Sequence, residues 1–319
     1  MNPIFLTGYA AFLLAAGFRL PSVKSRSLAR TLGWAIAAGT VFVSHCMTIG
    51  QPSLIRMTVI VFLQLLSMKG LVATESYAQR NGLNVIQWLA FSSWFGMRPQ
   101  PFEVMPDRPH PYLKLIAKAA SRMLAGICLL YLSSKLEHTS FSGFFLPELC
   151  LLAGVSLLLH FGVLTLSVAW WRMLGVDVQE LFREPYRAKT LKEFWGRRWN
   201  LAFSEMTALI VYRPLKSRLG ADNAITFSFL LSALLHEIAI SLPVMSGFGM
   251  PSAYFILHAT AMKLESIPGI SKKLIQRPLL SRFWVMSILL LPLPVLFHHD
   301  FIQYVLVPLR AHVLSLVSI

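Results

Sequence analysis

A histidine inside an apolar stretch is the residue of this sequence best suited to chemistry. His236 stands about 13 residues, or ~20 Å of helix, into an apolar run that begins near position 223. An ionisable side chain at that depth is costly and by default marks a functional site. Its imidazole could remove a proton near neutral pH as a general base. The alternative is a structural histidine that is hydrogen-bonded between helices.

Residues 191–200, LKEFWGRRWN, combine aromatic, basic and amide side chains just before another apolar run. The Asn200 amide could donate a hydrogen bond to a thioester carbonyl and stabilise the oxyanion that forms during attack. A helix N-cap is the other interpretation of Asn200, and the sequence alone slightly favours it.

Four neighbours of this amide are candidates for binding coenzyme A. Guanidinium groups bind phosphates bidentately, although interfacial arginines also face anionic lipid. Indole rings could wall an adenine or an acyl chain, although anchoring at the membrane interface is their commoner role. The four residues are Trp195, Arg197, Arg198 and Trp199.

Four further polar residues accompany the histidine within apolar runs. Ser232 lies four residues before His236, on the same helix face, and could hold the ring; a Ser bonded to its own backbone is the commoner case. Glu237 points roughly 100° away and is a poor partner for the ring. His258 and Glu265 share one face two turns apart. They could line a tunnel, but a structural polar contact is the favoured interpretation.

Cofactor and metal signatures are missing from the sequence. Cys46, Cys128 and Cys150 show no CxxC spacing, which argues against a disulfide framework and a zinc site. The histidines form no di-iron cluster, and neither a GxSxG elbow nor a glycine-rich phosphate loop is present. We therefore expect neither metal nor cofactor.

The composition indicates a membrane protein. Of 319 residues, 55% are hydrophobic and only 13% are charged, and the mean hydropathy is +0.61. Soluble domains carry roughly 25% charged residues. The net charge of +15 would otherwise suggest nucleic acid, but the bases fall in short links between apolar runs, as in cytoplasmic loops. Nucleic acid is therefore not an expected partner.

The elements that must position these residues are apolar helices. The predicted runs are 4–18, 31–48, 53–68, 123–136, 145–171, 223–242, 250–264, 283–297 and 300–318. Basic links should be cytoplasmic, and those of this chain begin at 19, 69, 172 and 263. The intervening links contain no Lys or Arg: 49–52, 137–144, 243–249 and 298–299. We expect an all-α multi-pass bundle of about nine spans with its N-terminus outside.

Two short apolar stretches do not fit as spans. Residues 201–212 carry Glu205 and have bases on both sides, which favours a re-entrant or interfacial segment. In residues 83–95, Trp88 and Trp94 suit an interfacial helix. No soluble stretch is long enough to form a unit of its own, so residues 1–319 are expected to form one domain.

The segment FWGRRWN, ending at Asn200, resembles the corresponding segment of plant wax synthases, which belong to the membrane-bound O-acyltransferase superfamily. Residues 229–237, FLLSALLHE, resemble the family's F-x-x-S-G-L-x-H-E segment. Residues 255–259, FILHA, with the later Glu265, resemble its F-x-x-H-G segment. The resemblance covers about 181–265, with Ala233 and Ala259 where the family usually has Gly.

The resemblance implies an MBOAT-like fold with His236 as the catalytic histidine and Asn200 as the second polar residue of the active site. Fungal terpenoid acetyltransferases share the same pattern. We therefore expect transfer of an acyl group from acyl-CoA to a lipophilic alcohol, either a long-chain alcohol or a terpenoid or sterol-like one. The alternative is a lipid transporter or lipid-binding membrane protein. The membrane would be the endoplasmic reticulum in a eukaryote and the inner membrane in a bacterium, and the oligomeric state stays open.

Overall fold

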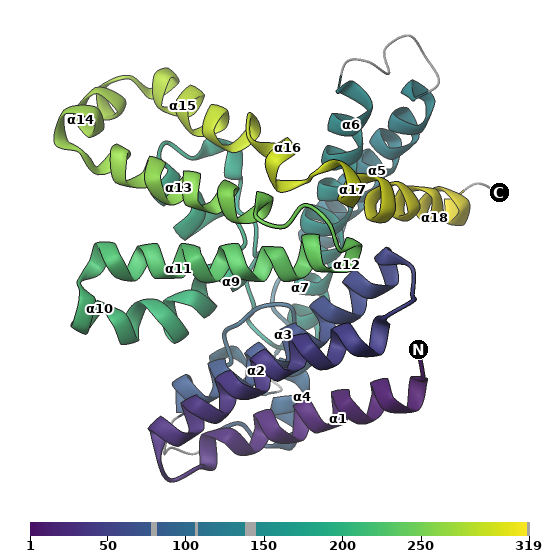
Figure 1. Ribbon diagram of the computed structural model, residues 1–319, viewed down its shortest axis with the longest axis vertical. Helices are drawn as coiled ribbons and strands as arrows, with labels where there is room; N and C mark the ends of the chain where they lie inside the picture. The colour runs from purple at the N-terminus through teal and green to yellow at the C-terminus, as the bar shows by residue number, and fades with distance from the viewer. Residues whose placement is uncertain (78–81, 106–107, 138–144, 318–319) are drawn as a thin grey trace.

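The computed structural model describes residues 1–77, 82–105, 108–137 and 145–317, without the side chains of 271–273 and 275. Within these ranges every regular element is a helix (Figure 1), which confirms the all-α prediction. Most of the predicted outer link 137–144 lies outside the described residues.

The first helices cross through small residues. α1 (Pro3–Arg19) meets α3 (Ser53–Tyr77) where Gly17 and Gly70 lie back to back. A Cβ atom on Gly70 would come within 3.0 Å of the Gly17 Cα atom, so neither position has room for a side chain. α2 (Arg26–Thr48) packs along α3. Such close crossings are typical of helices in membranes.

α4 (Val85–Ser93) occupies the predicted interfacial stretch, but its tryptophans are not surface anchors. Trp88 and Trp94 are each only 3% exposed. The Trp88 indole donates a hydrogen bond to the Leu14 carbonyl at 2.9 Å and packs on Gly17. Both rings are thus packed inside the protein, and for Trp88 the reason is that α1 offers the indole both an apolar surface and a backbone acceptor. The interfacial placement of the helix itself stays a prediction.

The central helices form an antiparallel pair with a similar small-residue crossing. α5 (Leu113–Leu136) packs on α6 (Leu146–Ser156) and α7 (Leu164–Met173), which a π-helical turn joins into one rod. A Cβ atom on Gly126 would lie 2.8 Å from the Gly154 carbonyl oxygen.

The candidate site residues belong to the next group of helices, in which α11 and α13 lie side by side (Figure 1). The bounds are α8 Leu191–Glu193, α9 Leu201–Thr207, α10 Arg213–Leu219, α11 Ala221–His236, α12 Leu242–Val244 and α13 Met250–Ser266. Gly220, with a φ of 80°, forms the turn between α10 and α11. The chain then continues through α14 Pro268–Gln276, α15 Pro278–Leu290, α16 Leu293–Leu296, α17 His299–Phe301 and α18 Val307–Val317.

Over the described residues, each of the nine predicted runs lies mainly in helix, and seven of the helical stretches are long and apolar enough to cross a membrane. They are Pro3–Ser22, Ser53–Tyr77, Leu113–Leu136, Leu146–Met173, Ala221–Val244, Pro278–Leu296 and His299–Val317. The runs 31–48 and 250–264 fall in α2, which is interrupted by polar residues, and in α13, which is only 17 residues long. A multi-pass bundle is confirmed, but the number nine is not.

Residues 201–212 are helical and continue into α10, so that 201–219 and α11 form a helical hairpin. This stretch is not among the seven candidate spans. Its carboxylate, Glu205, lies 3.7 Å from the Arg98 guanidinium, although burial raises the pKa of Glu205. The re-entrant or interfacial placement itself stays a prediction.

Ion pairs join links that the charge pattern assigns to the same side of the membrane. Arg26 contacts Glu75 at 2.9 Å. Further along the chain, Lys118 contacts Glu180 at 2.8 Å. Because each pair bridges two links predicted to be cytoplasmic, the folded chain is compatible with that topology.

Cysteine labelling tests this topology. In a background without Cys46, Cys128 and Cys150, cysteines introduced at Arg26, His110 and Pro185 are expected to react from the cytoplasmic side. A cysteine introduced at Ser246 is expected to react only from the opposite side. The reason is the one-sided distribution of Lys and Arg. Labelling of positions 110 and 185 from opposite faces would overturn the arrangement.

Candidate active site

The His236 ring is oriented by the backbone of its own helix. Its Nδ1 atom lies 2.7 Å from the Ser232 carbonyl oxygen. Because a carbonyl only accepts hydrogen bonds, Nδ1 carries the proton, and the neutral ring presents an unprotonated Nε2. Ser232 therefore does hold the ring, through its backbone carbonyl. A π-helical turn, a feature frequent at functional sites, follows at Glu237–Ser241.

Aromatic rings from two other helices flank His236. The Phe255 ring of α13 lies 4.2 Å away between centroids, at an interplanar angle of 41°. The Phe203 ring of α9 lies 6.0 Å away. The imidazole thus stands where α9, α11 and α13 meet, and its two neighbouring rings make the surroundings apolar.

Asn200 caps the helix that carries one of these rings. It is the N-cap of α9, with a φ of 43°, and its Oδ1 accepts a hydrogen bond from Phe203 N at 3.2 Å. Asn tolerates this left-handed conformation better than most residues. The cap interpretation is confirmed. The Nδ2 amide group makes no hydrogen bond within the described part of the chain. The cap leaves this donor available.

Arg198 is committed to the protein itself. Its guanidinium contacts the Glu193 carboxylate at 2.7 Å and donates to the carbonyls of Arg183 and Glu184 at 3.3 and 3.2 Å. Burial alone would raise the pKa of Glu193, but hydrogen bonds from the Lys189 backbone and from Arg198 lower it. The expectation that Arg198 binds phosphate is therefore not supported.

Arg197, the neighbouring base, is exposed, and no described residue pairs with it. A guanidinium in that state is available to an anion outside the chain. Its assignment to coenzyme A stays a prediction.

The two tryptophans of FWGRRWN point into the bundle. The Trp199 ring stacks on Phe194 at 5.5 Å and meets the Phe182 ring edge-on at 4.9 Å. The Trp195 ring packs between α11 and α13, against Phe229 and Phe255. Both rings therefore build the site from inside.

Glu237 and Glu265 cap neighbouring helices. Glu237 Oε1 accepts from the backbone N–H groups of Gly249 and Ser252 at the start of α13, so the prediction that it does not orient His236 is confirmed. Both Glu265 oxygens accept from Leu191 N at 2.9 Å, where α8 begins. Carboxylates stabilise helix N-termini in this way.

His258 is fully buried on α13, and its Nδ1 accepts a hydrogen bond from the Trp195 indole at 3.2 Å. His258 and Glu265 thus each make a polar contact within the protein, and Glu265 also lines a cavity described below. Each ties α13 to the segment 191–200 through a different group.

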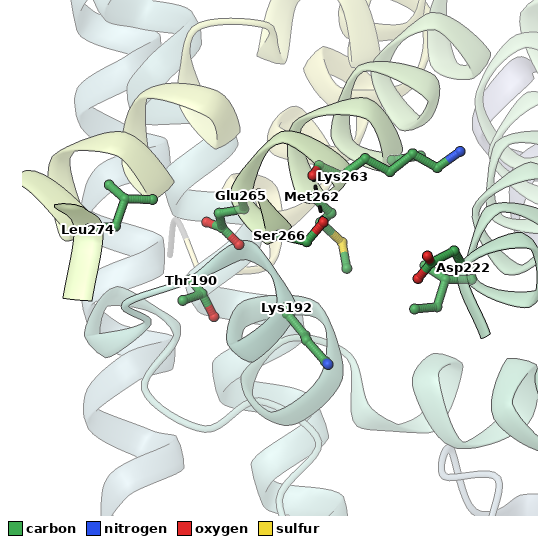
Figure 2. A pocket seen from close by; sticks show the side chains of 10 residues that line it. Thr190, Lys192, Asp222, Met262, Lys263, Glu265, Ser266 and Leu274 are labelled. Atoms are coloured by element: carbon green, nitrogen blue, oxygen red, sulfur yellow. Dashed lines mark hydrogen bonds between the residues drawn. The ribbon is translucent and has the colours of Figure 1, made fainter. Parts of the chain in front are cut away.

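A cavity of about 300 Å³ opens at the end of α11 and α13 opposite His236. Figure 2 shows Lys192, from the α8 segment, and Lys263, from α13, at this opening, with Asp222 of α11 beside them. Both lysines are exposed, and neither forms an ion pair within the described residues. Sequence reasoning missed this cavity, because its lining comes from positions that only the fold brings together.

One face of α11 connects the cavity to the histidine. Ile225 lines the cavity, Phe229 contacts Trp195, and Ser232 and His236 follow at helical spacing. From Ile225 to His236 the helix rises about 16 Å. This rise is the length that a ligand bound at the cavity must span to reach the imidazole.

Residues 178–257 match the membrane bound O-acyl transferase family. This segment contains Asn200, His236 and the rings around them. The described residues contain no group of three or more His, Cys, Asp or Glu side chains that could hold a metal ion. With its seven apolar helices, the chain is an integral, multi-pass membrane protein.

Similar proteins are plant enzymes by their names. The chain is 35% identical over 111 residues to the probable long-chain-alcohol O-fatty-acyltransferase 6 of Arabidopsis thaliana, covering 33% of this chain and 32% of the relative. It is 32% identical over 106 residues to the long-chain-alcohol O-fatty-acyltransferase of Simmondsia chinensis, covering 30% and 29%. These matches confirm the resemblance to the wax synthase-like branch. The matches cover about a third of the length of these relatives.

Proposed function

We propose that this protein is a membrane O-acyltransferase that transfers an acyl group from acyl-CoA to a lipophilic alcohol. The observation that carries the proposal is the His236 ring, whose Nδ1–H is held by the Ser232 carbonyl so that Nε2 is free to accept a proton. Similar proteins are named long-chain-alcohol O-fatty-acyltransferases, which makes a long-chain alcohol the first acceptor to test. Terpenoid and sterol-like alcohols follow.

In the proposed reaction His236 acts as a general base. The alcohol hydroxyl gives its proton to Nε2 while its oxygen bonds to the thioester carbonyl carbon. The C–S bond then breaks, and the thiolate of coenzyme A takes the proton back from the imidazolium. The products are the ester and free coenzyme A, and the imidazole returns to its starting form. General-base catalysis of this kind contributes about 10²–10⁴-fold.

Asn200 is proposed to stabilise the oxyanion through its Nδ2 amide group. Its Oδ1 is occupied by Phe203 N, so the amide is held in one orientation. The proposal is supported by Phe203, whose backbone N–H binds Oδ1 and whose ring centroid lies 6.0 Å from that of His236. A preorganised donor costs no reorganisation when charge develops on the carbonyl oxygen.

The phosphates of the donor are proposed to bind at the cavity, beside Lys192 and Lys263. Both exposed lysines line the cavity, and ammonium groups bind phosphate as point charges. The pantetheine arm would then lie along α11 toward His236. The bilayer supplies the alcohol laterally, in the endoplasmic reticulum or in a bacterial inner membrane.

The double change Lys192→Gln and Lys263→Gln tests the donor site. We expect the KM for acyl-CoA to rise by roughly tenfold or more, because a charged hydrogen bond contributes about 1.5–3 kcal/mol. The double change Lys216→Gln and Arg218→Gln is the matched control, since it also removes two positive charges, from exposed residues of α10 that do not line the cavity. If the control raised the KM for acyl-CoA equally, the effect would reflect general electrostatic attraction of anions and not a binding site at the cavity.

Lipid analysis of cells that express the chain tests the function as a whole. Fed with labelled fatty acid and a long-chain alcohol, such cells are expected to accumulate the ester, whereas cells with an inactive variant should not. If neither kind of cell made the ester although the wild-type protein was inserted into the membrane normally, the lipid-binding or transporter alternative would be favoured.

A further inference from the structure

The His258 ring contains a buried hydrogen-bond donor that the protein leaves unused. Its side chain is 0% exposed, and Nε2 finds no hydrogen-bond partner among the described residues. Buried polar groups in proteins are nearly always paired, so each exception calls for a physical explanation.

The hydrogen bond from Trp195 determines which ring nitrogen carries the proton. An indole N–H only donates, so His258 Nδ1 must accept, and the neutral ring holds its proton on Nε2. His236 has the opposite tautomer, with Nε2 unprotonated. The two histidines are therefore not interchangeable: one presents an acceptor and the other a donor.

His258 lies between the cavity and His236 along one face of α13. Glu265 and Met262 line the cavity, His258 follows one turn after Met262, and Phe255 contacts the His236 ring one turn further on. Ala259, the residue after His258 in the chain, also lines the cavity, so the ring lies directly beside the cavity wall.

We propose that His258 Nε2–H donates a hydrogen bond to an amide carbonyl of the pantetheine arm of the acyl donor. The proposal rests on the proposed function, because it takes the arm to run from the cavity to His236. Between its phosphates and its thioester this arm offers amide carbonyls as its strong neutral acceptors. Along the axis of α13, His258 lies about 4.5 Å from Phe255, on the side of the cavity. A pantetheine arm that enters from the cavity therefore passes His258 before its thioester reaches His236.

Hydrogen bonding to such a carbonyl explains the burial of an unpaired donor. The donor is kept away from water, and its desolvation cost is offset when the substrate arrives. A carbonyl oxygen suits the ring because Nε2–H is a hydrogen-bond donor. The same protonated nitrogen cannot accept a proton from the alcohol. His258 is thus a donor-binding residue distinct from the base.

The variants His258→Asn and His258→Gln separate this role from a structural one. Asn places its oxygen near the Nδ1 position, so it keeps the Trp195 hydrogen bond and loses the far donor. Gln places an amide N–H near the Nε2 position and loses the Trp195 hydrogen bond. We expect His258→Asn to raise the KM for acyl-CoA roughly tenfold and His258→Gln to stay near the wild-type value.

An acyl thioester that contains no amide group provides a second test. With the S-acyl thioester of 2-mercaptoethanol, His258→Asn and the wild type are expected to have the same KM. If this thioester is not turned over, the difference between the Asn and Gln variants toward acyl-CoA decides alone. The proposal would be overturned if His258→Gln raised the KM for acyl-CoA and His258→Asn did not. It would also be overturned if both variants raised this KM equally or if neither changed it. Absence of any ester from the wild type with acyl-CoA would instead overturn the proposed function.

Discussion

His236→Ala is expected to abolish ester formation, with a loss of about 10²–10⁴-fold in turnover from removal of the general base. Expression, detergent stability and binding of acyl-CoA should stay close to the wild type. The ring makes one hydrogen bond to its own helix and otherwise packs against Phe255 and Phe203. Turnover per folded molecule, measured with labelled acyl-CoA in detergent, is the decisive quantity.

The matched control is His312→Ala, an exposed histidine of α18. It removes the same side chain outside the site and should leave the rate unchanged. If His236 were only structural, its loss would lower stability through unpaired groups and spare turnover. Near wild-type turnover from well-folded His236→Ala protein would contradict the mechanism and favour the lipid-binding alternative.

The pH profile provides an independent test of the same residue. A protonated imidazole cannot accept the hydroxyl proton, so the wild-type rate should fall on the acid side. The residual activity of His236→Ala should lack this acid limb. An identical limb in the variant would assign the titration to another group.

Asn200→Asp is expected to lower turnover by about 10²–10³-fold, the cost of losing one oxyanion donor. This change separates the two roles of the residue. Asp caps a helix as well as Asn does and also tolerates the left-handed φ of 43°. It cannot supply the Nδ2 donor, and its charge repels a developing oxyanion.

The stability of the Asn200 variants provides the control. Thermal unfolding of Asn200→Asp should match the wild type, whereas Asn200→Ala should lose about 1 kcal/mol of stability with the cap. If Asn200 serves only as a cap, Asn200→Asp would keep full turnover and the oxyanion role would be withdrawn. Unlike loss of the base, this change should leave the acid limb of the pH profile in place.

The helices could be predicted from the sequence because their determinants are local. Apolar runs report burial in lipid, and over the described residues every predicted run lies mainly in helix. The number of membrane spans was harder to predict. Length excludes α13 from the candidate spans and hydropathy excludes α2, although both contain a predicted apolar run. The position of His236 well inside the candidate span Ala221–Val244 likewise followed from its place in one run.

Several polar residues were misjudged or missed because their partners lie far away in the chain. Lys69 seemed to open a cytoplasmic link, yet it is 0% exposed, and its ammonium donates to the carbonyls of Phe91 and Gly96 at 2.7 and 2.8 Å. Arg310 is buried within the last apolar run, where it pairs with Glu137 at 2.6 Å. Neither partner is signalled by spacing.

The sequence by itself determined the helical class, the membrane setting and the pair of chemical candidates, Asn200 and His236. These follow from hydropathy, from helix periodicity and from a short motif, all of which are readable within one segment. Only the tertiary structure decided which groups meet. In the folded chain Arg198 forms an ion pair with Glu193, and Trp195 donates a hydrogen bond to His258. The cavity is lined by residues of α8, α11 and α13. The physical reason is that pairing depends on packing between helices, which local pattern does not encode.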